Sequence, residues 1–201
     1  SDSGAAAIVT DAATLPRVMA LARDLPGLST IITTGAARAP VLGFDDLISG
    51  PPLRATADTA AEDPAVMIYT SGTTGDPKGV LHAHRFLFGH LPCMELSQGF
   101  FPQAGDVGWT PADWAWIGGL MDMAIPCLYY GVPLVSHRFA KFDPEAALRL
   151  MAEERVTNAF IPPTALRLMR QSVPPAGLCL RAIGSGGEAL GADLLDWGRE
   201  A

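Results

Sequence analysis

Cysteine is scarce in this sequence, and the cysteines that are present form no recognisable pattern. Cys93, Cys127 and Cys179 are far apart, odd in number and include no Cys-x-x-Cys pair. A disulfide framework needs paired cysteines, so this spacing argues against one and predicts free thiols in a reducing compartment.

Charged residues are also few. They make up 17% of the 201 residues, below the share of about 25% that is usual in soluble domains. The formal net charge is −7 and there is no basic cluster, which argues against nucleic acid as a partner. Because 49% of the residues are apolar, the shortage of charge indicates that other protein covers part of the surface.

Long apolar runs are missing as well. None approaches the roughly 20 residues that a transmembrane helix requires. The first residues, Ser1 to Gly4, lack the basic and apolar regions of a signal peptide. We therefore expect a cytoplasmic protein that does not cross a membrane.

The order of helices and strands predicts an α/β fold. Residues 5–10 and 28–34 have the apolar and β-branched composition of strands, and residues 15–25 between them have the apolar spacing of a helix. A strand, a helix and a second strand in succession form a parallel crossover unit. We expect two layered α/β subdomains, residues 1–99 and 100–201, each with its strands in one sheet.

The remaining elements are predicted from caps and short apolar runs. Asp143 and Pro144 are typical of an N-cap and a first helical residue, and Thr164 is expected to cap another helix. Residues 105–111 are expected to form turns. The other predicted elements are helices near 44–48, at 84–98, at 117–130 and from 191 onward, and strands at 65–70, 80–82, within 131–136, at 157–161 and at 180–183.

The stretch from Tyr69 to Gly79 (YTSGTTGDPKG) is the most informative part of the chain. It contains three glycines, four serine or threonine hydroxyls and one lysine. Glycines allow the backbone N–H groups to turn toward one point, which makes a concave site for an anion. Hydroxyl donors and the ammonium of Lys78 suit phosphate oxygens. The stretch therefore predicts a polyphosphate site.

The spacing differs from that of a Walker loop. Counted from Gly72, Pro77 stands where a Walker loop has its second glycine, and Gly79 follows Lys78 where serine or threonine is required. A surface loop with no ligand is the simpler alternative. The Pro-Lys-Gly run and the predicted strand on each side favour the phosphate site.

This stretch resembles the phosphate-loop signature of the adenylate-forming superfamily, which includes acyl-CoA synthetases, luciferases and peptide-synthetase adenylation domains. The resemblance extends along nearly the whole chain. It implies that the loop binds the β- and γ-phosphates of ATP and that Lys78 adds positive charge. The loop residues concerned are Thr70, Ser71, Gly72, Thr73, Thr74 and Gly75.

A second glycine-rich segment, GSGGEAL at 184–190, follows a predicted strand. By itself it is as consistent with an ordinary strand-to-helix turn as with a ligand site, although ligands of open α/β sheets bind at this end of the strands. It resembles the adenine-contacting segment of the superfamily. The resemblance implies that Gly186, Gly187, Glu188 and Ala189 line the adenine and the α-phosphate. The family often has proline where Ala189 stands.

The segment 110–120 carries two tryptophans, Trp114 and Trp116, and composition alone favours core aromatics for both. It is similar to the family segment in which an aromatic residue or a histidine begins a helix and gates the acyl pocket. Trp116 stands at the matching position. A tryptophan there, in place of histidine, makes this segment similar to that of the acetyl- and medium-chain CoA synthetases.

We predict no metal-binding residues in the chain. Its histidines at 82, 84 and 90 and Cys93 include no second close pair that would complete four ligands.

The resemblance implies an ATP-dependent acyl-CoA synthetase with a role in fatty acid metabolism. A carboxylic acid and ATP give an acyl-adenylate and pyrophosphate, and CoA then displaces AMP to form the thioester; Mg²⁺ accompanies ATP. An adenylation domain that loads a carrier protein, and a module that binds nucleotide without catalysis, remain the alternatives. The sequence does not identify the acyl group.

The family's enzymes are more than twice as long as this chain. The chain resembles a central part of their large N-terminal domain, without the mobile C-terminal domain that carries the catalytic lysine. We therefore expect no catalytic residue within it and no complete adenylation by it alone. Incomplete sheet edges would also favour self-association.

Overall fold

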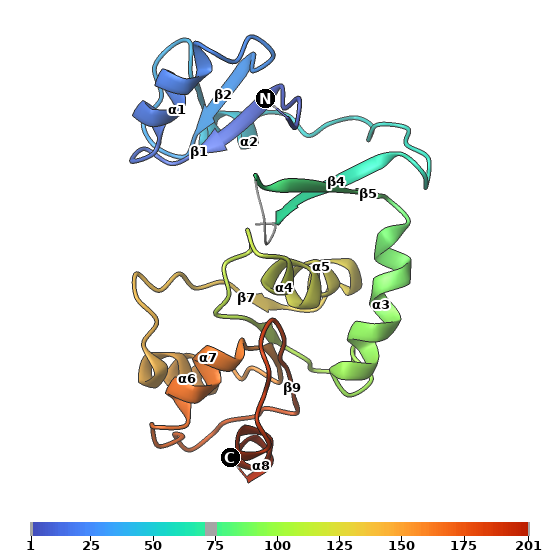
Figure 1. Cartoon of the computed structure of the whole chain (residues 1–201), viewed down its shortest axis with the longest axis vertical. Coiled ribbons are helices and arrows are strands. Elements are labelled where there is room, and N and C mark those ends of the chain that lie inside the picture. Colours follow the sequence, from blue (N-terminus) through green and yellow to red (C-terminus); the bar gives the residue numbers. More distant parts are fainter. Residues whose placement is uncertain (1, 71–75, 201) are drawn as a thin grey trace. The chain divides into compact units, whose positions relative to one another are not determined.

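The computed structural model describes residues 2–70 and 76–200. The chain divides into two compact units, residues 1–84 and 85–201 (Figure 1). The helix that follows the glycine-rich stretch belongs to the second unit. The subdomain boundary expected between residues 99 and 100 stays a prediction.

The first unit begins with the parallel crossover that the sequence predicts. Strand β1 (Ala7–Thr10) leads through helix α1 (Leu15–Ala22) to β2 (Thr30–Thr33), and the two strands pair in parallel. The short β3 (Leu42–Gly43) pairs with β2, also in parallel, and continues into α2 (Phe44–Ile48). The order of this three-stranded sheet is β1-β2-β3.

The two strands around the glycine-rich stretch form a sheet of their own. Strand β4 (Pro64–Thr70) pairs with β5 (Lys78–Ala83) in antiparallel fashion. The expectation of one sheet for this half of the chain is therefore wrong. The short connection between β4 and β5 requires these two strands to pair antiparallel with each other, and among the described residues neither strand pairs with β1, β2 or β3.

The second unit is built on a four-stranded parallel sheet of order β7-β6-β8-β9. Its strands are β6 (Gly108–Trp109), β7 (Leu134–Val135), β8 (Asn158–Phe160) and β9 (Ala182–Gly184). The helices are α3 (Phe86–Ser97), α4 (Ile117–Gly119), α5 (Ile125–Tyr130), α6 (Pro144–Glu153), α7 (Pro163–Met169) and α8 (Ala192–Glu200), with a π-helical turn η1 (Leu120–Ala124) between α4 and α5.

Two apolar clusters make the core of this unit. Consecutive residues of β8 belong to different clusters: Ala159 to the first and Phe160 to the second. Because neighbouring residues of a strand point to opposite faces, the two clusters lie on the two faces of the sheet. The first cluster draws mainly on α6, α7 and α8, and the second on α3, η1 and α5.

Two local predictions have different outcomes. Asp143 caps α6 as predicted, because its Oδ1 accepts a hydrogen bond of 3.0 Å from the N–H of Ala146. The prediction that Thr164 caps the next helix is wrong. Helix α7 begins at Pro163, and the extended Pro162 occupies the cap position; proline has the backbone angle that a first helical residue needs.

Candidate functional site

The first group of candidate residues surrounds the tip of the β4–β5 hairpin. The strands stay paired as far as Thr70 and Lys78, which are opposite each other. The side chain of Lys78 is exposed at the start of β5. Ser71, Gly72, Thr73, Thr74 and Gly75, and the side chain of Thr70, lie outside the described residues, so their contact with phosphate stays a prediction.

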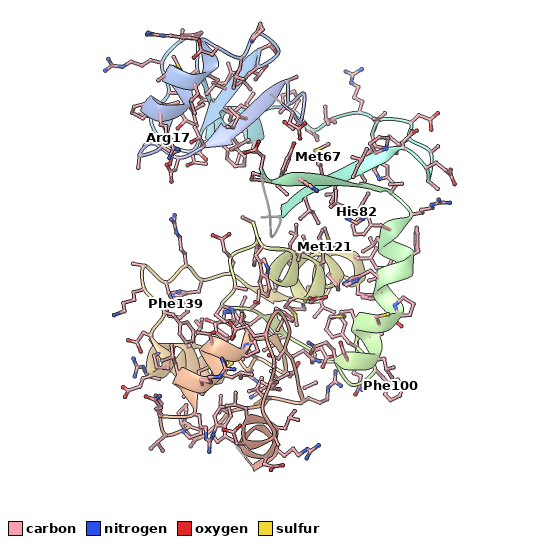
Figure 2. The ribbon with its side chains drawn as sticks, viewed as in Figure 1. Arg17, Met67, His82, Phe100, Met121 and Phe139 are labelled. Atoms are coloured by element: carbon pink, nitrogen blue, oxygen red, sulfur yellow. The ribbon has the colours of Figure 1, made fainter. Side chains whose placement is uncertain are left out.

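Gly79 has a steric reason to be glycine. A Cβ atom at this position would lie 2.9 Å from Sδ of Met67 and 3.1 Å from Cζ of Tyr69, both on the opposing strand. Met67 and His82 mark these two strands in Figure 2. Because Gly79, the residue after Lys78, has no side chain, the side chains of Met67 and Tyr69 on β4 can occupy the space beside β5.

The second group of candidates lies in the second unit, at the carboxyl end of β9. The strand ends at Gly184 and α8 begins at Ala192. Between them Gly187 has a φ of +91°, a conformation that favours glycine. Residues 187–189 are exposed, so this turn is open to a ligand.

Trp116 lies against this turn. A Cβ atom on Gly187 would be 2.9 Å from Cζ2 of Trp116, and one on Gly186 would be 3.8 Å from Cζ of Phe160. The rings of Trp116 and Phe160 have their centroids 5.7 Å apart. The predicted acyl-pocket residue and the predicted adenine turn thus share one surface, with the buried Phe160 as its floor.

Phe160 was not predicted as a site residue. It is the last residue of β8, which is the neighbour of β9 in the parallel sheet. The carboxyl ends of parallel strands meet at one edge of a sheet. A prediction of that strand order would have found Phe160.

Glu188 and Ala189 are bound by two residues of α7. Oγ1 of Thr164 donates to Oε1 of Glu188 over 2.6 Å, and Nη1 of Arg167 donates to Oε2 over 2.9 Å. Nη2 of Arg167 also donates to the carbonyl oxygen of Ala189 over 3.0 Å. The hydrogen bond from Thr164, followed by that from Arg167, holds the pKa of Glu188 below its ordinary value.

Metal ligation finds no support in the part of the chain that the structure describes, where no group of three or more His, Cys, Asp or Glu residues is suitably placed. His90 instead lies 3.2 Å from Oδ1 of Asp122 and 2.9 Å from the carbonyl oxygen of Met121. Among residues 2–70 and 76–200 there is also no helix with the length and apolarity needed to cross a bilayer.

Known proteins resemble the chain over most of its length. Acetyl-coenzyme A synthetase of Stutzerimonas stutzeri is 32% identical over 173 residues, which are 78% of this chain and 25% of that protein. Acetyl-coenzyme A synthetase 1 of Saccharomyces cerevisiae is 32% identical over 149 residues, which are 68% of this chain and 20% of that protein. The chain therefore spans a quarter or less of the length of these relatives.

Solved structures share the fold. An anthranilate CoA ligase in complex with anthranoyl-AMP superposes with a TM-score of 0.85 at 25% identity. The superposition covers all of this chain and 39% of the ligase chain. The ATP-bound MatB of Rhodopseudomonas palustris superposes with a TM-score of 0.77 at 27% identity. That superposition covers 98% of this chain and 38% of the MatB chain.

The model of one protein family, described as AMP-binding enzyme, matches residues 1–201. That match extends over the whole chain and agrees with the relatives and the fold. The chain belongs to the AMP-binding enzymes, the adenylate-forming superfamily that its glycine-rich stretch resembles.

Proposed function

We propose that the protein activates a carboxylic acid with ATP and transfers the acyl group to CoA. The observation that carries this proposal is the shared surface of Trp116, Phe160 and the turn at 186–189. A reaction between a carboxylate and the α-phosphate of ATP needs the acyl site and the adenine site to be adjacent. In this chain Trp116 and Gly187, which are expected at those two sites, lie next to each other.

Each group of residues has a separate task in the proposed reaction. A carboxylate oxygen attacks the α-phosphorus, and the bond from the α-phosphorus to the oxygen that bridges the α- and β-phosphates breaks, so that pyrophosphate leaves with the electron pair. The hairpin loop and Lys78 bind the departing phosphates and stabilise their charge. The turn at 186–189 lines the adenine and the α-phosphate, while Trp116 and Phe160 form the wall of the site for the carboxylic acid.

The relatives support CoA as the acceptor in the second step. Two of them are named acetyl-coenzyme A synthetases, and the ligase crystallised with anthranoyl-AMP is named for CoA. Acetate and other short carboxylates are therefore the first substrates to test. A role in fatty acid metabolism stays a prediction. Mg²⁺ is expected with ATP; among the described residues no group of three or more His, Cys, Asp or Glu residues is placed to hold it.

The test measures pyrophosphate release by the protein in its natural full length, with ATP and carboxylates of increasing chain length, with and without CoA. We expect release with at least one carboxylate, and AMP with a thioester when CoA is added. No release with any carboxylate would contradict the proposal. An adenylate that forms but does not react with CoA would favour the carrier-protein alternative.

A substitution at the hairpin tests the phosphate assignment. Lys78→Ala should raise the KM for ATP about tenfold, because a charge-assisted hydrogen bond to phosphate is lost. Lys141→Ala removes an exposed lysine of the second unit and serves as the matched control. Equal ATP saturation curves for the two variants would contradict the role of Lys78.

A further inference from the structure

Arg167 of helix α7 connects two consecutive residues of the turn after β9. One of its guanidinium nitrogens binds the carboxylate of Glu188, and another binds the main-chain oxygen of Ala189. Thr164, three residues earlier on the same helix, binds the other oxygen of that carboxylate. The helix thus holds both a side chain and the backbone of the turn.

No backbone–backbone hydrogen bond holds the described turn. In the part of the chain that the structure describes, the backbone N–H and C=O groups of residues 186–190 form no hydrogen bond with another backbone group. Gly187 has the wide conformational freedom of glycine. An exposed turn without backbone hydrogen bonds samples several conformations unless side chains fix it. The contacts from α7 therefore decide where this backbone lies.

We infer that Arg167, supported by Thr164, is a positioning residue that holds Gly186 to Ala189 in the conformation that binds the adenine and α-phosphate. The inference rests on the proposed function, since it concerns the nucleotide site of that reaction. Arg167 acts through the turn and need not touch the nucleotide itself. An arginine suits this task because its planar fork can donate to two acceptors at fixed geometry, whereas lysine has a single ammonium.

The ion pair between Arg167 and Glu188 is exposed, so its loss should affect the position of the turn more than the stability of the fold. The side chains of Arg167 and Glu188 are 48% and 50% exposed, and ion pairs of this kind contribute little to the free energy of unfolding. The carboxylate of Glu188, whose pKa lies below its ordinary value, is ionised at neutral pH and pairs with Arg167 as a charge. Loss of Arg167 should therefore leave the fold intact and free the turn.

The experiment compares Arg167→Gln with Arg170→Gln. Arg170 follows the same helix, is 44% exposed and pairs with Asp193 of α8 at 2.5 Å, so it matches Arg167 in place and environment without contacting the turn. Calorimetry on the natural full-length protein measures the affinities for AMP and for pyrophosphate, and thermal unfolding measures the Tm. AMP probes the turn, and pyrophosphate probes the hairpin loop.

We expect Arg167→Gln to weaken AMP binding about tenfold, as for a site that holds its binding conformation a tenth of the time. Its pyrophosphate affinity and Tm should equal those of the wild type, and Arg170→Gln should change none of the three. Arg167→Lys should fall between Arg167→Gln and the wild type. In steady-state kinetics the loss should appear in the KM for ATP rather than the KM for the carboxylate.

The outcomes separate this inference from the proposed function. If the wild type binds AMP and Arg167→Gln binds it equally well, the positioning role is wrong and the proposed function stands. If Arg167→Gln and Arg170→Gln weaken AMP binding equally, or if Arg167→Lys equals the wild type, the inference is also wrong. A wild-type protein that binds neither AMP nor pyrophosphate would contradict the proposed function, and the inference with it.

Discussion

Single glycines show how closely the candidate site is packed. Gly177 and Gly187 have nearly the same backbone angle, with φ of +94° and +91°. A Cβ atom on Gly177 would meet nothing within 4 Å, whereas one on Gly187 would press on the indole of Trp116. The two positions therefore allow the cost of backbone strain to be measured apart from the cost of displacing Trp116.

Gly177→Ala should lower the free energy of unfolding by about 1 kcal/mol, because it forces a side chain into a left-handed conformation, and Gly187→Ala should lower it further, because Trp116 must also be displaced. Only Gly187→Ala should also weaken AMP binding, by about tenfold, since Trp116 must move away from the turn. Thermal unfolding and calorimetry check the two effects. Equal AMP affinities in both variants would show that Trp116 and the turn are independent.

Cys127 is buried and Cys93 is exposed, so the thiol of Cys93 should react faster than that of Cys127. Cys127 is completely buried, and its burial, aided by the charge of Asp106, raises the pKa of its thiol to about 12. Only the thiolate reacts with alkylating reagents. At pH 8 iodoacetamide should therefore modify the exposed Cys93 and leave Cys127 unmodified.

Mass spectrometry of the digested protein measures this labelling, and the same reaction in concentrated urea, where both thiols should react, is its control. Modification of Cys127 at the rate of Cys93 in the folded protein would disprove the buried position.

At the scale of helices and strands, a buried polar network joins the end of α3 to the sheet. Arg181 donates to the carboxylate of Asp106 at 2.6 Å and to the carbonyl oxygen of Gly99. Asn158 donates to the carbonyl oxygen of Gln98 over 2.9 Å, and Gln98 donates to that of Ala159 over 3.1 Å. Asp106 is only 5% exposed, and its carboxylate accepts hydrogen bonds from Arg181, from Oγ1 of Thr157 and from the N–H of Gln103.

Arg181→Met should destabilise the protein by about 3 kcal/mol, because it leaves the buried carboxylate of Asp106 without its cation. Arg199→Met removes the exposed partner of Asp196 and should change the free energy of unfolding by less than about 0.5 kcal/mol. Urea unfolding monitored at constant pH compares the two variants. A small effect of Arg181→Met would mean that the remaining donors suffice for Asp106.

Elements with a local signal could be predicted from the sequence, and elements that depend on distant partners could not. The cap of Asp143 and the short helix Phe44–Ile48 rest on neighbouring residues and are confirmed. Strand β6 has two residues, Gly108 and Trp109, and was expected to be a turn. Its strand character comes from pairing with β7 and β8, which follow much later in the chain.

The same distinction applies to the candidate site. The turn at 186–189 and Trp116 were predicted because their own sequences resemble family segments. Thr164 and Arg167 were not, since their role depends on β8 and β9 being neighbours in the sheet. Thr164 in particular was predicted as a helix cap, and its hydroxyl instead binds Glu188.

At the scale of the whole molecule, the first unit contains one long exposed connection. Residues 51–60 lie outside helices and strands and are all exposed. Proteases cut such segments first, because the backbone can enter the protease without unfolding the rest.

Trypsin should therefore cleave first after Arg54 in this connection. Arg38 is also exposed in a loop, but its carbonyl oxygen accepts a hydrogen bond from Val41, which should slow cleavage there. Mass spectrometry of a short digestion identifies the first cut, and Arg54→Gln should abolish it. A first cut within residues 85–201 would contradict this order.

The positions of the tryptophans give the molecule a built-in optical label for one of its halves. All four, at 109, 114, 116 and 197, belong to the second unit, and Trp109 is completely shielded from water. Indole emission thus reports on that unit alone, whereas far-ultraviolet circular dichroism senses the backbone of both. Denaturation curves recorded by the two signals would coincide for a single cooperative molecule and separate if the halves melt independently.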